Sequence, residues 1–312
     1  MSQVPSTQRA RLAAAGAQSA TAEVILGRRS MSDVLRGRLF HALLLLAISL
    51  AVIGLGMLIL DALVEGQSRL GPELFTEGSA VSPADSGFKP AIYGTVIVIG
   101  GVVLMTVPLG VGAALYLEEY ANRERWWNRV IELNIQNLAA VPSIVYGILG
   151  LAFFVRGPLD LGFVAFAGSL TLTLLVLPTV IIAGREAIRA VPPSIREGAL
   201  ALGATQWQTV RRQVLPASIA GIVTGVILAI SRAIGETAPL LLVGAATLVT
   251  REPTDPFTDS YTVLPVQIFQ YFSRAQEDYR ILAAAGIIVM LIVLLLMNSF
   301  AIWLRNRYEQ RW

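Results

Sequence analysis

The sequence has 312 residues, of which 55% are hydrophobic and 14% are charged. Soluble globular domains carry about 25% charged residues, so this composition excludes a soluble domain and indicates a polytopic membrane protein. The formal net charge is only +3, which argues against a nucleic-acid partner. The chain has no cysteine and a single histidine, His41. These counts exclude a disulfide framework and a catalytic thiol, and we expect neither a catalytic constellation nor a metal site.

Six apolar runs are long enough to cross a hydrocarbon core about 30 Å thick, which takes about 20 helical residues. They cover residues 39–60, 91–117, 133–155, 161–183, 217–238 and 281–304. Backbone groups find no water in the membrane, so each run must be a helix. The sequence therefore predicts an all-α membrane protein with a six-helix domain over residues 39–304. A disordered, arginine-rich tail over 1–38 precedes this domain, and a short tail over 305–312 follows it.

Basic residues concentrate in alternate connections between the predicted spans. The two tails and the loops 118–129 and 184–216 are rich in arginine. The opposite side holds Arg69, Lys89, Arg156, Arg251, Arg274 and Arg280. Because cytoplasmic loops carry the excess of Lys and Arg, both termini and the 184–216 loop are predicted to lie in the cytoplasm.

The fifth run contains an ionisable pair, Arg232 and Glu236, with Thr237 beside it. A charge at the centre of a membrane costs roughly 2.5–3.5 kcal/mol on insertion scales, so such residues mark a pathway or an obligatory partner. Four-residue spacing puts both side chains on one helical face. We interpret this face as the lining of a translocation pathway, or alternatively as an ion pair that fixes helix packing.

The third run begins with polar residues, including Asn137, and then contains Pro142 and Ser143. A proline inside a span frees a backbone carbonyl, and such irregular backbone is tolerated where it lines a cavity. The run is therefore a candidate part of the same pathway. A kink satisfied by a neighbouring helix is the alternative.

The polar 184–216 segment carries two capping-box patterns, Ser194 to Glu197 and Thr205 to Gln208. They predict two short helices separated by Gly203. On the second helix, Trp207, Val210 and Val214 recur at helical spacing and form an apolar face. We expect this face to be covered by the membrane interface or by a groove on a partner protein.

The fifth run also carries a stripe of small residues that allows close helix crossing, within the chain or with a similar subunit. The stripe consists of Ala217, Gly221, Gly225, Ala229 and Ala233. Pro239 then interrupts the run and predicts a separate short or re-entrant segment after it. A further amphipathic segment begins near Pro265 and is expected at the outer end of the bundle.

The run EGALALGATQWQTVRRQVLP, residues 197–216, resembles the cytoplasmic signature of permease subunits of ABC importers. The matching positions are Glu197, Ala199, Gly203, Leu215 and Pro216. Gly198 stands where that family usually has alanine, and Gln213 where it usually has isoleucine. NLAAVPSIVYGILGL, SRAIGETAPLLLVGA and LPVQIF further resemble the A-type subunit of the phosphate-specific permease family.

The resemblance implies a type I importer permease in the bacterial inner membrane, with inorganic phosphate as substrate. Glu197, Gly198, Ala199, Gly203, Trp207, Leu215 and Pro216 would then couple it to an ATPase. The implied partners are a C-type permease, two ATPase subunits and an extracytoplasmic phosphate-binding protein. The only lysine is Lys89 in an outer loop, so the chain has no nucleotide-binding phosphate loop. ATP and Mg²⁺ would therefore be bound by the ATPase subunits, and this chain needs no cofactor.

Two other classes compete with an ATP-driven importer. An ion-coupled secondary transporter usually shows two halves related by an inverted repeat, which these six spans do not. A membrane-embedded enzyme would need a constellation of catalytic groups beyond one buried Arg/Glu pair. Within the importer class, a buried arginine suits any oxyanion, so sulfate and molybdate remain alternatives to phosphate on physical grounds. Glu197 has a second interpretation as a helix cap alone.

Overall fold

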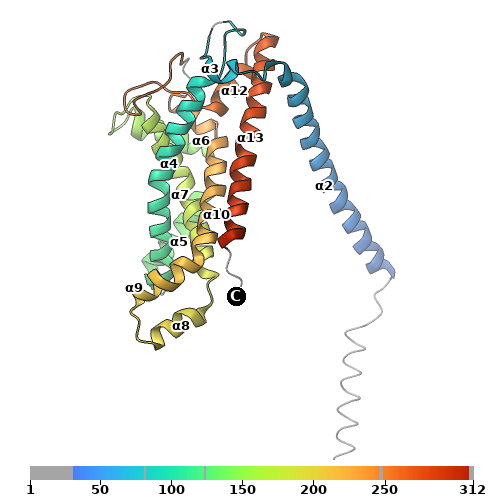
Figure 1. The fold of residues 1–312 in the computed structure, drawn as a ribbon. Coiled ribbons are helices and arrows are strands. Elements are labelled where there is room, and N and C mark those ends of the chain that lie inside the picture. Colours follow the sequence, from blue (N-terminus) through green and yellow to red (C-terminus); the bar gives the residue numbers. More distant parts are fainter. Residues whose placement is uncertain (1–30, 81, 123, 246–248, 309–312) are drawn as a thin grey trace, which may run out of the picture. The chain divides into compact units, whose positions relative to one another are not determined.

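The computed structural model describes residues 31–80, 82–122, 124–245 and 249–308, and these residues form helices and loops without any strand (Figure 1). The chain divides into two units, residues 1–60 and 61–312. The predicted tail lies outside the described residues up to position 30. Its remaining residues form the first turns of α2 (Met31–Gly66). The reason is that extending an existing helix by one residue is much easier than starting one.

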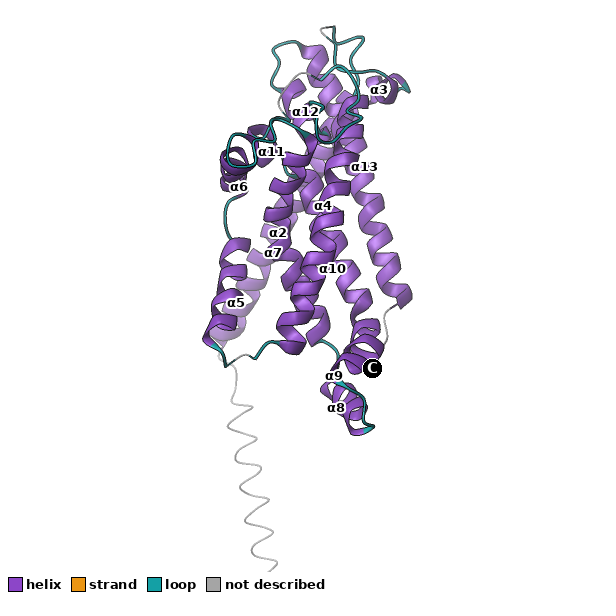
Figure 2. Ribbon diagram, turned by 90° about the vertical axis from the view of Figure 1, so that its left-hand side faces the viewer, coloured by secondary structure: helices purple, strands orange, loops and turns teal. Residues whose placement is uncertain are grey.

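The second unit is a bundle of long helices with short helices at both ends. Its long helices are α4 (Lys89–Leu115), α7 (Ala165–Arg189), α10 (Leu215–Gly235) and α13 (Glu277–Tyr308). One end carries η1 (Gln67–Arg69), α3 (Glu73–Thr76) and α12 (Leu264–Phe272). The other end carries α8 (Pro193–Ala201) and α9 (Gln206–Thr209) (Figure 2).

Among the described residues, five helices are long and apolar enough to cross a membrane, and a bent helix pair makes a sixth crossing if it forms one span. The bent pair is α5 (Trp126–Ala139) followed by α6 (Ser143–Gly150), and its two helices differ in direction by 102°. A π-helical turn, η3 (Leu151–Val155), continues α6. The predicted third span, 133–155, is thus two helices in sharply different directions. The break falls at Pro142, which lacks the N–H that a continuous helix would need.

The predicted fifth span, 217–238, begins earlier and ends earlier than expected. A π-helical turn, η4 (Val210–Val214), joins α9 to α10, so the helix runs from Gln206 to Gly235. The short helix expected at 205–208 is therefore the start of this long helix. The expected segment after Pro239 is confirmed as α11 (Ala238–Leu242). A third π-helical turn, η2 (Tyr116–Tyr120), follows α4.

α7 lies at the centre of the second unit and packs against α4, α5, α6 and α10. Its residues Leu172, Val176 and Ile188 are fully buried, although the sequence alone marks this run as an ordinary span. The small-residue stripe of α10 explains one of these contacts. A Cβ on Gly221 or Gly225 would lie only 2.8 or 2.6 Å from an alanine Cβ of α7. The stripe therefore serves close packing within the chain.

Candidate functional site

The fifth-run ion pair lies where α10 ends. Arg232 occupies the last turn of α10, and Glu236 is its C-cap, with an extended backbone that turns the chain away. The Nε of Arg232 lies 3.4 Å from Oε1 of Glu236. The side chain of Arg232 is 57% exposed in this chain, whereas that of Glu236 is 15% exposed. Thr237 follows directly and is partly buried before α11 begins.

The geometry of this pair is loose. A single contact at 3.4 Å involves one guanidinium nitrogen, whereas strong Arg–carboxylate pairs use two parallel N–H donors. Within the described residues, Arg232 forms no other ion pair. The two terminal nitrogens of its planar fork are therefore available to an anion or to a group on a neighbouring subunit.

The break between α5 and α6 packs against the break between α10 and α11. Tyr146 of α6 lies in one buried cluster with Ala229 and Ala233 of α10. A Cβ on Gly147 would lie 2.7 Å from the Cα of Pro239, so the two backbones touch. The hydroxyl of Tyr146 donates a hydrogen bond of 2.8 Å to the carbonyl of Leu138, which stabilises the end of α5 before the break.

The structure thus brings together the backbones of both predicted pathway segments. Asn137 and Pro142 are exposed at the α5–α6 break, and Ser143 there is partly exposed. In the described part of the chain, neither Asn137 nor Ser143 is hydrogen-bonded to Arg232 or Glu236. The two breaks meet through Tyr146, Gly147 and Pro239 instead.

The connection between α8 and α9 contains the second group of predicted site residues. Gly203 has φ +83°, a left-handed conformation that side chains with a Cβ adopt only with strain. The capping box at Thr205 and Gln208 is confirmed, with both reciprocal hydrogen bonds present. Glu197, Gly198 and Ala199 all lie on α8, where the first two are exposed.

The other predicted capping box is wrong. α8 begins at Pro193 with Pro192 as its N-cap and without a side-chain capping hydrogen bond, so Ser194 lies inside the helix. Two successive prolines fix the backbone angle that a helix start requires, one residue before Ser194. Glu197 is therefore not the reciprocal partner of a capping serine.

The predicted apolar face of the second helix is split between two environments. Val210 and Val214 are buried, and Val214 packs with Ile188 of α7 and with Val191 just after that helix. Leu215 packs against the same cluster, and Pro216 follows in the first turn of α10. The expectation that the membrane interface or a partner protein covers Val210 and Val214 is wrong, because the chain itself covers them.

Trp207, by contrast, is 60% exposed, and Leu202 is 91% exposed. Leu200 on α8 is also exposed. We call these three residues the α8–α9 apolar surface. Isolated exposed apolar residues are common on proteins, but three on one short connection favour a contact surface.

A cluster of ion pairs near α8 and α9 is not evident in the sequence. It joins Glu118 and Glu119 of η2 to Arg185 and Arg189 of α7 and Arg196 of α8. The side chains of Glu118, Glu119 and Arg185 are no more than 8% exposed. The only sequence signal is two acidic residues at the end of an apolar run and two arginines at i,i+4 spacing.

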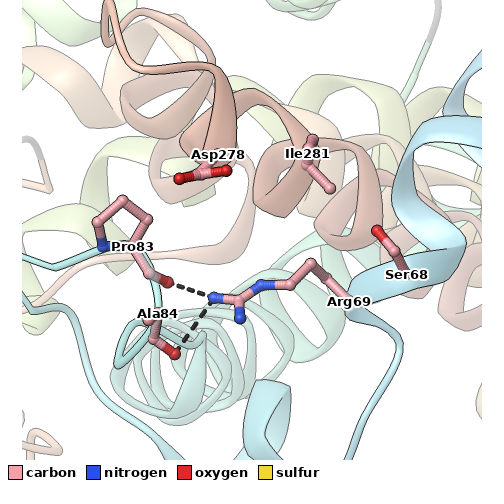
Figure 3. A pocket seen from close by; sticks show the side chains of 6 residues that line it. All are labelled: Ser68, Arg69, Pro83, Ala84, Asp278 and Ile281. Carbon is pink, nitrogen blue, oxygen red and sulfur yellow. Dashed lines mark hydrogen bonds between the residues drawn. The ribbon is translucent and has the colours of Figure 1, made fainter.

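A pocket of about 290 Å³ lies at the other end of the bundle, between Arg69, Asp278 and Ile281 (Figure 3). The guanidinium of Arg69 donates hydrogen bonds to the backbone carbonyls of Pro83 and Ala84. Its role is thus to hold the loop before α4, and we assign no ligand to this pocket.

Residues 106–312 match the family described as binding-protein-dependent transport system inner membrane component. This match covers most of the second unit, including both helix breaks and α8–α9. The chain belongs to this family. Membership agrees with the helical bundle described above and identifies the chain as a multi-pass membrane protein.

Among curated relatives, the probable ABC transporter permease YqgI of Bacillus subtilis is 32% identical, covering 78% of this chain and 85% of that protein. The phosphate transport system permease PstA 1 of Mycobacterium tuberculosis is 36% identical, covering 70% of each chain. The PstA of Haemophilus influenzae is 31% identical, covering 83% of this chain and 92% of that protein.

Solved structures show the same fold at low sequence identity. A bacterial alginate ABC transporter in complex with a periplasmic protein matches 91% of this permease and 99% of the other chain, with a TM-score of 0.64 and 19% identity. The MetNI methionine ABC transporter, in an inward-facing conformation, matches 70% of this permease and 92% of the other chain, with a TM-score of 0.54 and 15% identity. The expected importer-permease fold is thereby confirmed.

Proposed function

We propose that this chain is the A-type permease subunit of an ATP-driven importer of inorganic phosphate. The observation that carries the proposal is Arg232, which is exposed beside two packed helix breaks and whose terminal nitrogens form no ion pair with any described residue. The names of the Mycobacterium and Haemophilus relatives support phosphate as the cargo. A planar guanidinium can bind an oxyanion through two parallel hydrogen bonds.

The transport step requires no covalent chemistry from this chain. Arg232 would bind the anion as the anion passes the paired breaks. Glu236 would limit the affinity of this binding by competing for the same guanidinium. Binding must be favourable enough to admit the anion and weak enough to release it. Thr237 and Ser143 would supply hydroxyl groups near the same place, and the backbone at Asn137 and Pro142 would line the passage.

The exposure of Arg232 supports a subunit arrangement in which a second permease completes the passage. A charged side chain facing lipid is strongly disfavoured, so this face of α10 needs either water or protein beside it. The proposed neighbour is the C-type permease. Two ATPase subunits would dock on α8–α9 in the cytoplasm, and a phosphate-binding protein would dock at the α3–α12 end outside.

The test is ATP-dependent uptake by the reconstituted complex. The chain is co-expressed with its neighbouring permease and ATPase, purified in mild detergent and placed in vesicles with the binding protein and labelled phosphate. We expect uptake that needs ATP and is not displaced by excess sulfate or molybdate. Preferential uptake of sulfate or molybdate would show that the cargo is that oxyanion and not phosphate. Uptake without an ATPase would contradict an ATP-driven importer.

A further inference from the structure

A shielded ion pair ties α8 to the end of α4. The Nε and Nη2 atoms of Arg196 donate hydrogen bonds of 3.0 and 2.8 Å to Oε1 of Glu119 in η2. The Glu119 side chain is 8% exposed and that of Arg196 is 22% exposed. This contact therefore has the short, multiple, partly desolvated geometry that the Arg232–Glu236 pair lacks.

The same guanidinium also binds the end of α7. Nη1 donates 2.6 Å to the carbonyl of Val191, and Nη2 donates 2.8 Å to the carbonyl of Ile188. Carbonyls at a helix C-terminus lack intrahelical partners, and a cation there is favourable. Arg196 thus connects three elements, namely α8, η2 and the end of α7.

α9 is attached to the same residue from its other side. The side-chain amide of Gln206, at the start of α9, donates a hydrogen bond to the backbone carbonyl of Glu119. The carboxylate of Glu119 therefore accepts hydrogen bonds from α8, and its backbone carbonyl accepts one from α9. α8 and α9 therefore share one anchoring residue in η2, the turn that follows α4.

Glu118, next to Glu119 in η2, connects this cluster of ion pairs to α5. Glu118 accepts hydrogen bonds from Arg185 and Arg189 of α7, and Arg185 also contacts Glu132 of α5 at 2.8 Å. α5 ends at Ala139, immediately before the break at Pro142. A series of ion pairs therefore links α8 through η2 and α7 to α5, the helix that ends just before the α5–α6 break.

We propose that Glu119 and Arg196 are positioning residues that transmit movement of α8 and α9 to α4, α7 and the α5–α6 break. The inference rests on the proposed function, because it assumes that an ATPase moves α8 and α9. A displacement of α8 must then carry α4 and α7 with it or break the Glu119–Arg196 contact.

The test compares Glu119→Gln with Glu186→Gln in reconstituted complexes. Glu186 is a matched control because its carboxylate is exposed on α7 and pairs only with Arg189, one turn away, among the described residues. The measured quantity is phosphate taken up per ATP hydrolysed, normalised to assembled complex. We expect Glu119→Gln to lower this ratio roughly 2- to 30-fold, the range for residues in a coupling network, and Glu186→Gln to leave it unchanged.

A second set of variants covers the case in which Glu119→Gln assembles poorly. Arg196→Lys keeps the charge but loses the fork, and the double variant Glu119→Gln with Arg196→Gln removes both charges. We expect both variants to assemble. The phosphate taken up per ATP should fall less in Arg196→Lys than in Glu119→Gln, and in the double variant it should fall as far as in Glu119→Gln. A wild-type ratio in either assembled Glu119→Gln or the double variant would overturn the inference. Absence of uptake by wild-type complex would instead contradict the proposed function.

Discussion

At the scale of single residues, the Arg232–Glu236 pair differs from the Glu119–Arg196 pair in ways that predict different roles. Arg232 is half-exposed and touches Glu236 through one contact of 3.4 Å. A single long contact made by a largely exposed arginine contributes about 0–1 kcal/mol to stability. Helix packing therefore depends little on this pair, and its arginine is free to bind another group.

The first prediction concerns Arg232 alone. Arg232→Gln should assemble with its partners nearly as well as wild type, because the lost pair is weak. It should lower phosphate uptake about 10- to 100-fold, since hydrogen bonds to a charged group are worth about 1.5–3 kcal/mol. Arg232→Lys should retain partial uptake. The measurement is initial uptake rate per assembled complex, and normal uptake by Arg232→Gln would exclude a role in the pathway.

The second prediction concerns pH and Asp259, in the loop before α12. Its carboxylate accepts hydrogen bonds from the backbone of Asp255 and from the backbone and hydroxyl of Thr254. These bonds hold the pKa of Asp259 below its usual value. A lowered pKa contributes stability above the usual value near 3.9, and this stability is lost as pH falls through the lowered pKa.

Protection of the 250–260 backbone against hydrogen exchange reports this effect. We expect wild-type protection to persist from pH 7 to about pH 5 and to fall below about pH 4. Asp259→Asn should show reduced protection at every pH, without the fall. A wild-type loop whose protection does not change between pH 5 and pH 3 would contradict this role of the carboxylate.

At the scale of elements, the α8–α9 connection depends on Gly203. A β-branched residue at φ +83° carries about 1–3 kcal/mol of strain, whereas asparagine tolerates this conformation better. We expect Gly203→Val to weaken ATPase association and to separate hydrolysis from transport, while membrane insertion stays intact. Gly203→Asn is the matched control and should retain most association. Co-purification of the ATPase measures the difference, and equal recovery with both variants would contradict a docking role for the connection.

Sequence reasoning located the spans but not the breaks within them. Apolar length predicts a crossing because the membrane thickness is fixed, and α4, α7 and α13 follow this rule. The direction of a helix after a proline depends on its neighbours. Here α6 packs beside α11 at Gly147, and the run containing Pro142 alone could not specify this contact or the 102° bend that accompanies it.

The candidate site was predicted where the residues are close in sequence. Arg232 and Glu236 could be paired from their spacing, and Gly203 and Thr205 from their turn and capping preferences. The contact of Glu119 with Arg196 spans 77 positions, so only the packing of α4 against α7 brings it about. Val210 was expected to face the membrane interface or a partner protein, because an amphipathic pattern shows that a face is covered and does not show what covers it.

At the scale of the whole molecule, the distribution of arginine predicts which end faces the cytoplasm. The chain has no cysteine, so single cysteines can report the side of the membrane. Ser82 and Thr258 are exposed near the α3–α12 end, and Leu202 is 91% exposed on the α8–α9 connection. An impermeant thiol reagent added outside intact cells should label Ser82→Cys and Thr258→Cys only. Labelling of Leu202→Cys from outside, before the cells are opened, would reverse the orientation.

We propose that Arg232 binds the anion and that the helices at the two breaks pack without its help. Removing both charges of an ion pair avoids the penalty of leaving one charge unpaired. The double variant Arg232→Gln with Glu236→Gln therefore separates the two roles. We predict that the assembled double variant hydrolyses ATP yet takes up labelled phosphate about 10- to 100-fold more slowly than wild type, because it lacks the charged donor. Uptake at the wild-type rate by the double variant would contradict the account.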